Sequence, residues 1–389
     1  MKRLIFCPGI CQIVNAAAAL DRDHGQDHAD QEDILVLFGR SRESVYGRAM
    51  KEMARDVWPW RDICWAEDII LWYMPTRRYA PVVREVLNNR YGRNVDEIWI
   101  SMLWVDSTKL ILYAFPNARV VLFEDGVVEY IGQGMACGYD RWKRLRPGQW
   151  PGAFKRECSH WNARSECMEI NEICMRDLKR VDVMYSYLDG MLNMPEYLSR
   201  VPRVHVDDAC LRNRYRALAE PVCASEYAQP PVARDESVLL FLPQPFAVLF
   251  LTTEDEYQLY RSAVSLILEK GYTVLWKEHP QETTPLAPRL KEEFGDHRLK
   301  LIHARQQLPV ESLVAGWNLA GVVSVSSTSL LYLHGLYGYP MFTASDQLTL
   351  DRWLKRTERE LARLFLNYVP GLDELPVAGS GGETTQACL

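Results

Sequence analysis

The segment Gly271-Tyr-Thr-Val-Leu-Trp-Lys-Glu-His-Pro280 decides how the rest of this chain is interpreted. Its apolar run, Thr273 to Trp276, is long enough for a buried strand and short for a helix. The polar residues Lys277-Glu-His-Pro280 follow immediately, at the point where the strand ends. Ligands of open α/β sheets bind outside the carboxyl ends of the strands, so the segment predicts a ligand site; a surface turn that contains a histidine is the alternative.

The amino-terminal end repeats this strand-and-turn pattern. Leu4-Ile-Phe-Cys7 predicts a first strand, Pro8-Gly9 a turn, and Gln12 to Leu20 a helix. Gln12 and Asn15 are three residues apart, so both point to the same side of that helix. They either line the crevice at the strand end, together with Gly9, or solvate the end of the helix. Residues 21–32 are polar and predict a surface loop.

A carboxylate pair follows a later strand of the first half. Strands are predicted at residues 33–38, 95–102 and 119–123, separated by helical stretches, which is the alternation of a parallel sheet. The last of these runs directly into Glu124-Asp125-Gly126, where the glycine lets the backbone turn. Asp125 is therefore our candidate for a general base. Alternatively, Asp125 caps a helix over residues 127–131.

The second half begins after a segment of linker composition at residues 221–236, which contains three prolines. Beyond it we predict a strand at 238–242, a helix at 254–270 and a short helix after Pro309 with Glu311 in its first turn. A strand at 321–325 precedes Ser326-Ser-Thr-Ser329, which opens a helix and provides hydroxyl and N–H groups suited to a phosphate, or only a helix cap. The predicted organisation is an α/β chain with domains at 1–225 and 236–349, a closing helix at 350–370 and a disordered tail at 371–389.

Bulk composition limits the classes of function. With 389 residues, 48% of them hydrophobic, the chain can bury two domain-sized cores. The net charge of −6 argues against a general nucleic-acid binder. Ten cysteines occur without a Cys-x-x-Cys pair or zinc-finger spacing, so we expect reduced thiols and no metal site. The first residues lack the features of a signal peptide or membrane span, which leads us to expect a cytoplasmic protein.

A basic, tryptophan-rich excursion interrupts the first domain at about residues 132–175. Arginines and lysines alternate there with Trp142, Trp150 and Trp161. Cations and stacking aromatics suit an anionic glycan or a membrane surface, so peripheral association with the inner membrane is one hypothesis. The alternative is a solvated excursion whose tryptophans pack against the domain.

Four short motifs stand in a fixed order: Glu124-Asp125-Gly126, Lys277-Glu-His279-Pro280, Pro309-Val-Glu311 and Ser326-Ser327. This order resembles the bacterial sialyltransferases and polysialyltransferases of the GT-B type, with their acidic-acidic-glycine, His-Pro and serine motifs. Residues 8–15 also look like the first turn and helix of that family. The resemblance covers most of the chain apart from the excursion and the tail.

The resemblance implies two Rossmann-like domains facing across a cleft and an inverting transferase without cofactor or catalytic metal. It would move a nonulosonic acid from a CMP-sugar donor to a glycan acceptor in the synthesis of a surface polysaccharide or lipooligosaccharide. Asp125 would take the acceptor proton, and His279 would contact the phosphate of the leaving CMP. The donor site would comprise Lys277 and Pro280 near the cytidine, Glu311 at the ribose, and Ser326, Ser327 and Thr328 at the phosphate, with Gly9, Gln12, Asn15, Glu124 and Gly126 lining the cleft.

Two features leave alternatives open. Glu278 stands where the family has a small residue, and Thr328 extends the serine motif, so the hydroxyls that contact phosphate are not settled by the motif. Another CMP-sugar, such as Kdo, legionaminic or pseudaminic acid, is an alternative donor. A nucleotide- or glycan-binding module without activity is the alternative from another class of function.

Overall fold

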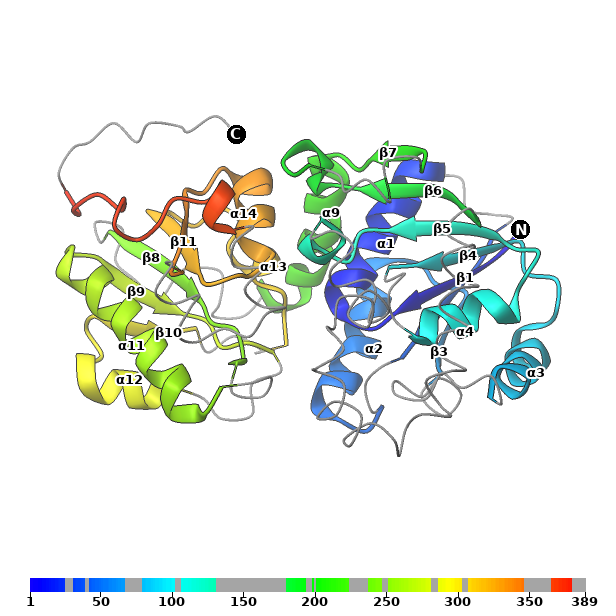
Figure 1. Ribbon diagram of the computed structural model, residues 1–389, viewed down its shortest axis with the longest axis horizontal. Helices are drawn as coiled ribbons and strands as arrows, with labels where there is room; N and C mark the ends of the chain where they lie inside the picture. The colour runs from blue at the N-terminus through cyan, green and yellow to red at the C-terminus, as the bar shows by residue number, and fades with distance from the viewer. Residues whose placement is uncertain are drawn as a thin grey trace, which may run out of the picture. The chain divides into compact units, whose positions relative to one another are not determined.

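The chain forms two compact units, Met1–Arg214 and Tyr215–Leu389 (Figure 1). The computed structural model describes residues 1–24, 31–38, 42–66, 79–101, 106–130, 180–193, 198, 201–223, 237–246, 251–280, 286–302, 307–345 and 365–379. The basic excursion lies outside these ranges. The segment predicted as a linker begins inside helix α9 (Asp208–Cys223), which includes residues 221–223, and its part from 224 to 236 is outside the described residues.

The first unit contains a parallel sheet of seven strands in the order β3-β2-β1-β4-β5-β6-β7. Strand β1 lies inside the sheet, where Leu4 pairs in register with Ile34 on one side and Ile98 on the other. Strands β2 and β3 therefore lie on one side of β1, and β4 to β7 lie on the other side. The strands are β1 (Lys2–Cys7), β2 (Glu32–Leu37), β3 (Asp62–Trp65), β4 (Glu97–Ile100), β5 (Arg119–Phe123), β6 (Val181–Ser186) and β7 (Arg203–His205).

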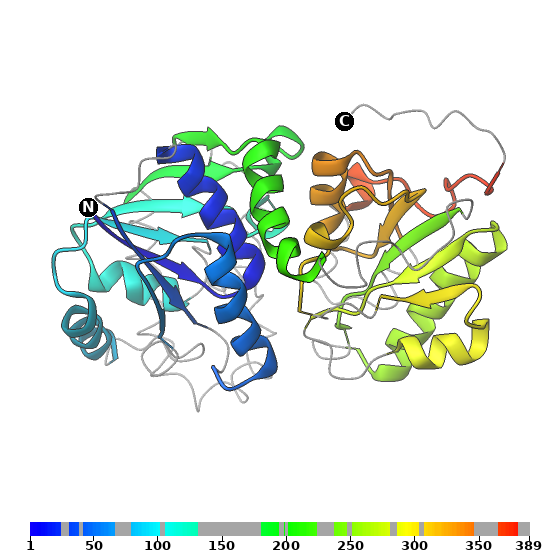
Figure 2. The same ribbon diagram turned by 180° about the vertical axis from the view of Figure 1, so that it is seen from behind.

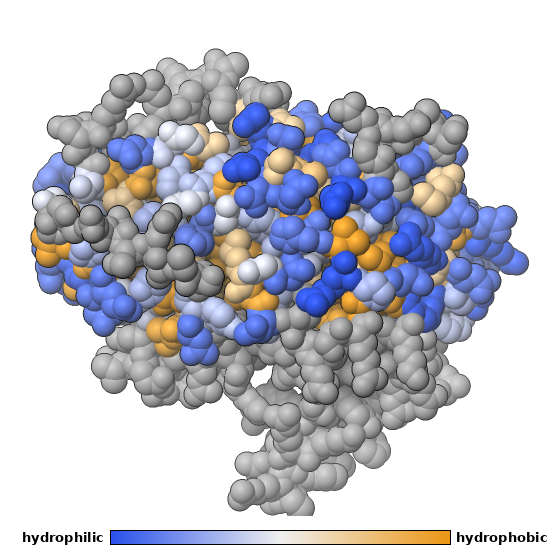
Figure 3. Space-filling model, turned by 90° about the horizontal axis from the view of Figure 1, so that it is seen from above, coloured by the Kyte–Doolittle hydropathy of each residue, from blue (hydrophilic) through white to orange (hydrophobic). Residues whose placement is uncertain are grey.

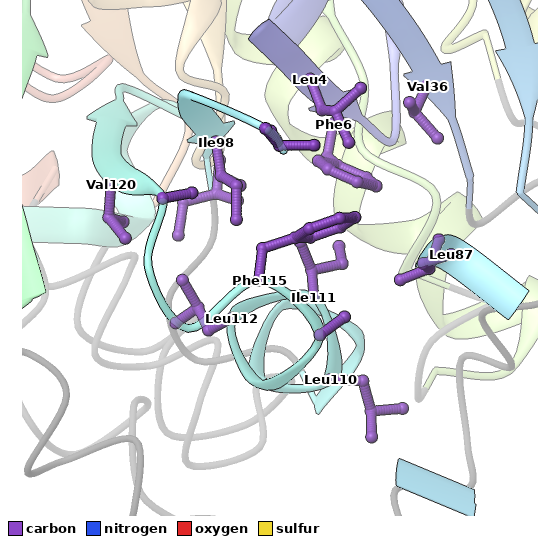
Figure 4. Close-up of a cluster of buried hydrophobic side chains, with 14 of the residues drawn as sticks. Leu4, Phe6, Val36, Leu87, Ile98, Leu110, Ile111, Leu112, Phe115 and Val120 are labelled. Atoms are coloured by element: carbon purple, nitrogen blue, oxygen red, sulfur yellow. The ribbon is translucent and has the colours of Figure 1, made fainter. Parts of the chain in front are cut away.

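Both faces of this sheet are covered by helices, as near-continuous apolar strands require. Alternate strand residues such as Leu4, Phe6 and Ile98 pack with α3 (Tyr79–Tyr91) and α4 (Asp106–Ala114) in one apolar core (Figure 4). Helices α1 (Ile10–His24) and α2 (Val45–Val57) lie on the opposite face (Figure 2). Helix α1 packs against β1 and β5, which places its first turns beside the carboxyl ends of these strands.

The second unit contains a parallel sheet of five strands in the order β10-β9-β8-β11-β12. As in the first unit, the first strand, β8, lies in the middle of the sheet. Strands β9 and β10 are added on one side of it, and β11 and β12 on the other. Its strands are β8 (Val238–Leu242), β9 (Thr273–Trp276), β10 (Leu299–Leu301), β11 (Gly321–Ser324) and β12 (Met341–Thr343), and its helices are α11 (Thr253–Glu269), α12 (Ala287–Phe294), α13 (Val310–Leu313) and α14 (Ser329–Tyr337).

The entry into β9 follows from its local sequence. Helix α11 begins at the cap Thr252, whose hydroxyl accepts from the Asp255 N–H at 3.1 Å. The helix ends before Gly271, where φ is +89°, a value that a residue with a side chain rarely adopts. The chain then enters β9, where Trp276 is fully buried and stacks on Phe241 of β8 at 4.9 Å between ring centroids. This strand has the bounds that the sequence predicts.

Three details differ from the sequence-based expectations. Helix α1 continues to His24, into the segment predicted as a loop. The stretch between β2 and β4, predicted as helical, also contains the edge strand β3. Residues 371–379 belong to the predicted disordered tail, yet Leu372 and Leu375 are buried in the core of the second unit, and Gly371 forms a bridge with Thr343. Apolar side chains at these two positions stabilise the segment against the sheet. Residues 380–389 and most of the predicted closing helix lie outside the described residues.

On the face shown in Figure 3, hydrophilic residues predominate among the coloured atoms, and apolar residues occur in small groups between them. No helix within the described ranges is long and apolar enough to cross a membrane.

Candidate active site

The sites in both units lie at the carboxyl edge of a sheet, where the strand order reverses. Such a topological switch point is where open α/β sheets bind ligands. In the first unit, Gly9 and Gln12 follow β1, and Glu124 and Asp125 follow β5. In the second unit, Lys277 follows β9, and Ser326 to Thr328 connect β11 with α14.

Asp125 is held in place by the first helix. The Gln12 Nε2 group donates to Asp125 Oδ1 at 2.6 Å. The next helical turn adds a second tie, because Asn15 Nδ2 donates to the Glu124 backbone oxygen at 2.9 Å. Both amides therefore connect helix α1 to the acidic motif after β5; that they line a ligand crevice stays a prediction.

Gly9 and Gly126 make this arrangement possible. A Cβ atom at Gly9 would lie 2.5 Å from Gln12 Oε1, so a larger residue would push away the side chain that holds Asp125. Gly126 has a φ of +138°, which allows the chain to turn immediately after the acid. The turn leads into a short 3-10 helix, η1 (Val127–Tyr130).

Glu124 has a structural role. Its side chain is buried, and its Oε2 accepts from the Tyr130 hydroxyl at 2.6 Å, the Tyr187 N–H at 3.1 Å and the Leu188 N–H at 2.9 Å. These three donors compensate for the burial of the carboxylate. Glu124 therefore joins the end of β5 to the turn that follows β6, and it orients the backbone from which Asp125 projects.

The pKa of Asp125 is suited to proton transfer near neutrality. Burial raises this pKa from its ordinary value of 3.8 to about 7, while the hydrogen bond from Gln12 lowers it and the nearby charge of Glu124 raises it. A general base is most effective when its pKa lies near the working pH. The Cys7 thiol at the end of β1 has a pKa well above its ordinary value, because it is buried and lies near Asp125, so it is a poor nucleophile.

In the second unit, Lys277 and Glu311 come together from different elements. Both side chains are buried, Lys277 after β9 and Glu311 in the first turn of α13. Burial raises the pKa of Glu311, while a hydrogen bond with Ser329 and the charge of Lys277 lower it. No described residue bonds to Glu311 Oε2. The hydroxyl of Tyr337 on α14 donates to the Glu311 backbone oxygen at 2.7 Å, which joins α13 to α14.

Glu278, which stands where the family has a small residue, makes a structural hydrogen bond. Glu278 Oε1 accepts from the N–H of Ala287, the first residue of α12, at 3.2 Å. Glu278 therefore connects the segment after β9 to the start of α12 through Oε1, while no described residue bonds to its buried Oε2. His279 and Pro280 are both half-buried beyond the end of β9.

The serine motif forms the connection between β11 and α14. Ser326 and Ser327 are buried between β11 and α14, and Thr328 is half-buried at the helix cap. The N–H of Ser329, the first residue of α14, donates to Ser327 Oγ at 3.3 Å, while the cap residue of this helix is Thr328. The hydroxyl proton of Ser327 can still be donated to a ligand.

Some important residues were not identified from the sequence. Tyr130 and the N–H groups of Tyr187 and Leu188 complete the Glu124 site, but they are brought there by the pairing of β5 with β6. Ser329 belongs to the serine motif, but its bond to Glu311 depends on how α13 packs on α14. Within the described ranges, no group of three or more His, Cys, Asp or Glu side chains is arranged to hold a metal ion.

Two Rossmann-like units, each with polar residues at its switch point, define an α/β protein of the GT-B class. Residues 3–346 match the family model described as alpha-2,8-polysialyltransferase. The chain belongs to this family, and it is a glycosyltransferase of the sialyltransferase type, as the motif order indicated. No curated protein matches it significantly.

Solved structures share the fold at low sequence identity. UDP-GlcNAc 2-epimerase from Neisseria meningitidis, bound to UDP-GlcNAc, has a TM-score of 0.52 and 15% identity, with 89% of this chain and 83% of that one covered. The GT-B domain of a sialyltransferase from Photobacterium damselae has a TM-score of 0.46 and 11% identity, with 95% of this chain and 100% of that one covered. The first of these similarities establishes the likeness in fold.

Proposed function

We propose that the protein transfers a nonulosonic acid, most simply sialic acid, from a CMP-sugar to a hydroxyl of a glycan acceptor. The observation that carries this proposal is Asp125, a carboxylate held by Gln12 with a pKa of about 7, in a chain of the polysialyltransferase family. We further propose a surface polysaccharide or lipooligosaccharide as the product and the cytoplasm, or the cytoplasmic side of the inner membrane, as the location.

Asp125 acts as the base in the proposed reaction. The acceptor oxygen attacks the anomeric carbon of the donor sugar as its proton passes to Asp125, and the bond from that carbon to the phosphate oxygen of CMP breaks. One direct displacement inverts the configuration at the anomeric carbon. The step needs no metal ion in this scheme, because the protein supplies both the base and the donors to the leaving group.

The second unit stabilises the departing CMP. His279 and the hydroxyls of Ser326 and Ser327, with Thr328 as a further candidate, donate to the phosphate as its negative charge develops. The N–H groups at the start of α14 favour the same anion. Lys277 and Pro280 lie near the cytidine. A ribose hydroxyl would donate to the carboxylate of Glu311, whose Oε2 has no hydrogen-bond partner among the described residues.

The direct test is mass spectrometry of the products formed from CMP-sialic acid and an oligosaccharide that ends in sialic acid. We expect an acceptor enlarged by one or more sialic acid units, with CMP released. Asp125→Ala and His279→Ala should each lower the rate about 100-fold or more. Near-normal turnover in either variant would exclude the role given to that residue.

Matched controls separate loss of chemistry from loss of fold. Asp296→Ala and His297→Ala change exposed residues in the turn before β10, at the amino end of that strand, and should leave transfer unchanged. A panel of CMP-sugars with the wild-type protein identifies the donor. If none supports release of CMP while CMP itself still stabilises the protein against heat, the chain is a binding module and the proposal is wrong.

A further inference from the structure

A histidine–aspartate pair stands at the carboxyl edge of the first sheet, apart from the proposed catalytic residues. His205, the last residue of β7, has its Nδ1 atom 2.9 Å from Asp189 Oδ1. The His205 side chain is 51% exposed, whereas that of Asp189 is 14% exposed. An oriented imidazole on an accessible strand end is a group that can contact a ligand.

The pair is built on a rigid base. Asp189 lies in the short 3-10 helix η5 (Leu188–Gly190), whose first N–H donates to the buried Glu124 carboxylate. The Tyr187 ring stacks on that of His205, with 6.2 Å between centroids and 23° between planes. Since the Tyr187 N–H also donates to Glu124, the same residues fix His205 and the backbone of the acidic motif.

The spacing of the strands places this pair at a useful distance from Asp125. Strand β5 pairs with β6, and β6 pairs with β7, where Ser186 is in register with His205. Neighbouring strands are about 4.8 Å apart, so the ends of β5 and β7 are separated by about 10 Å along the edge of the sheet. That interval corresponds to one or two sugar units of an acceptor chain whose terminal hydroxyl lies at Asp125.

The chemistry of the pair fits a sugar hydroxyl. When Nδ1–H donates to Asp189, the tautomer of the neutral ring is set and Nε2 becomes the acceptor. No described residue bonds to Nε2. A sugar hydroxyl can donate a hydrogen bond to Nε2, which is an exposed acceptor with a fixed direction.

We propose that His205, oriented by Asp189 and stacked on Tyr187, binds a hydroxyl of the acceptor glycan in the sugar next to the one that receives the transferred residue. The inference rests on the proposed function, because it assumes that the acceptor end lies at Asp125. The end of β7 then recognises the acceptor and takes no part in binding CMP.

The test compares acceptor and donor kinetics in His205→Ala. The expected result is an acceptor KM about fivefold higher, the value of one hydrogen bond, with donor KM and the slow hydrolysis of CMP-sialic acid without acceptor unchanged. Asp189→Asn should raise acceptor KM to a smaller extent, because the ring remains but its tautomer is no longer fixed. A role confined to stability would lower thermal stability without a selective change in acceptor KM, and that result would overturn the inference.

A direct binding measurement keeps the test independent of turnover. Calorimetric titration of the wild-type protein and His205→Ala with a sialic acid trimer should show weaker binding by the variant, while His297→Ala, a change of another exposed histidine, binds normally. Equal affinity in wild type and His205→Ala, or an unchanged acceptor KM in an active enzyme, would also overturn the inference. Absence of all transfer by the wild type, with the difference in binding preserved, would instead count against the proposed function.

Discussion

A single carboxylate can serve as a base near neutral pH only if it is neither fully solvated nor tightly paired with a cation. Asp125 satisfies both conditions, because burial raises its pKa and the side chain that donates to it, Gln12, is neutral. The carboxylate of the neighbouring Glu124 accepts three structural hydrogen bonds. The two adjacent carboxyl groups therefore differ in their surroundings: Glu124 is held by structural hydrogen bonds, whereas Asp125 remains available as the proposed base.

The first prediction concerns the pH dependence of transfer. In the proposed mechanism the carboxylate form of Asp125 is the active one, so kcat/KM should fall as the pH drops through about 7. Gln12→Leu removes the hydrogen bond that favours the carboxylate, so the acidic limb should move to higher pH. Gln258→Leu, on the outer side of α11, is the control and should leave the profile unchanged. An unshifted limb in Gln12→Leu would show that another group controls the profile.

A second prediction follows from the same pKa by linkage. A carboxyl group whose pKa is higher in the folded than in the unfolded state destabilises the fold as the pH rises through the interval between the two values, here from about 4 to about 7. Asp125→Asn should therefore increase the free energy of unfolding at pH 8, by on the order of 2 kcal/mol after allowance for partial exposure, and have little effect at pH 4. Urea unfolding at the two pH values measures the difference; equal effects at both would contradict it.

At the scale of elements, the sequence predicted the strands that have apolar runs, and also the edge strand β7 at residues 203–206, but it missed the edge strands β3 and β10. Strands β5, β8 and β9 have the predicted bounds or lie within a residue of them. Each is a short, mostly apolar run bounded by polar or turn residues, a pattern that favours a buried strand. Strands β3 and β10 are short, and each has a charged or half-exposed residue among its members. These two strands bury few of their residues, so their sequences lack the apolar run that indicates a buried strand.

The candidate site was predictable to the same extent. Asp125, His279 and the serine motif were proposed as site residues because each follows a recognisable strand. The partners of Glu124 were not, because Tyr130 comes from η1 and Leu188 lies 64 residues away in the chain. Contacts of this kind depend on strand pairing, which a single sequence does not reveal. The bond between Ser329 and Glu311 joins two helices and has the same cause.

The third prediction concerns the element ends that Glu124 joins. Glu124→Ala leaves the Tyr130 hydroxyl and two backbone N–H groups buried without their acceptor, so the free energy of unfolding should fall by roughly 3 kcal/mol. Glu43→Ala, in which the side chain is 78% exposed, should change it by less than about 0.5 kcal/mol. Equal stability of the two variants in urea would show that Glu124 does not anchor these elements.

At the scale of the whole molecule, the proposed base and the proposed donor site belong to separate units. Asp125 belongs to Met1–Arg214, whereas Lys277, Glu311 and the serine motif belong to Tyr215–Leu389. Each unit has its own core and its own switch point, so a change in one need not alter the other. The proposed function therefore implies that nucleotide binding and chemistry can be separated by substitution.

The fourth prediction tests this separation. Asp125→Asn should abolish transfer yet bind CMP with a Kd within about twofold of the wild type, since effects of residues without shared partners are close to additive. Glu311→Gln should raise the Kd for CMP about tenfold, because a ribose hydroxyl would lose a charged acceptor. Calorimetry with CMP measures both, and thermal unfolding verifies that Glu311→Gln is folded. If Asp125→Asn weakened CMP binding as much as Glu311→Gln does, the nucleotide would contact the first unit directly, and the assignment of base and donor site to separate units would have to be abandoned.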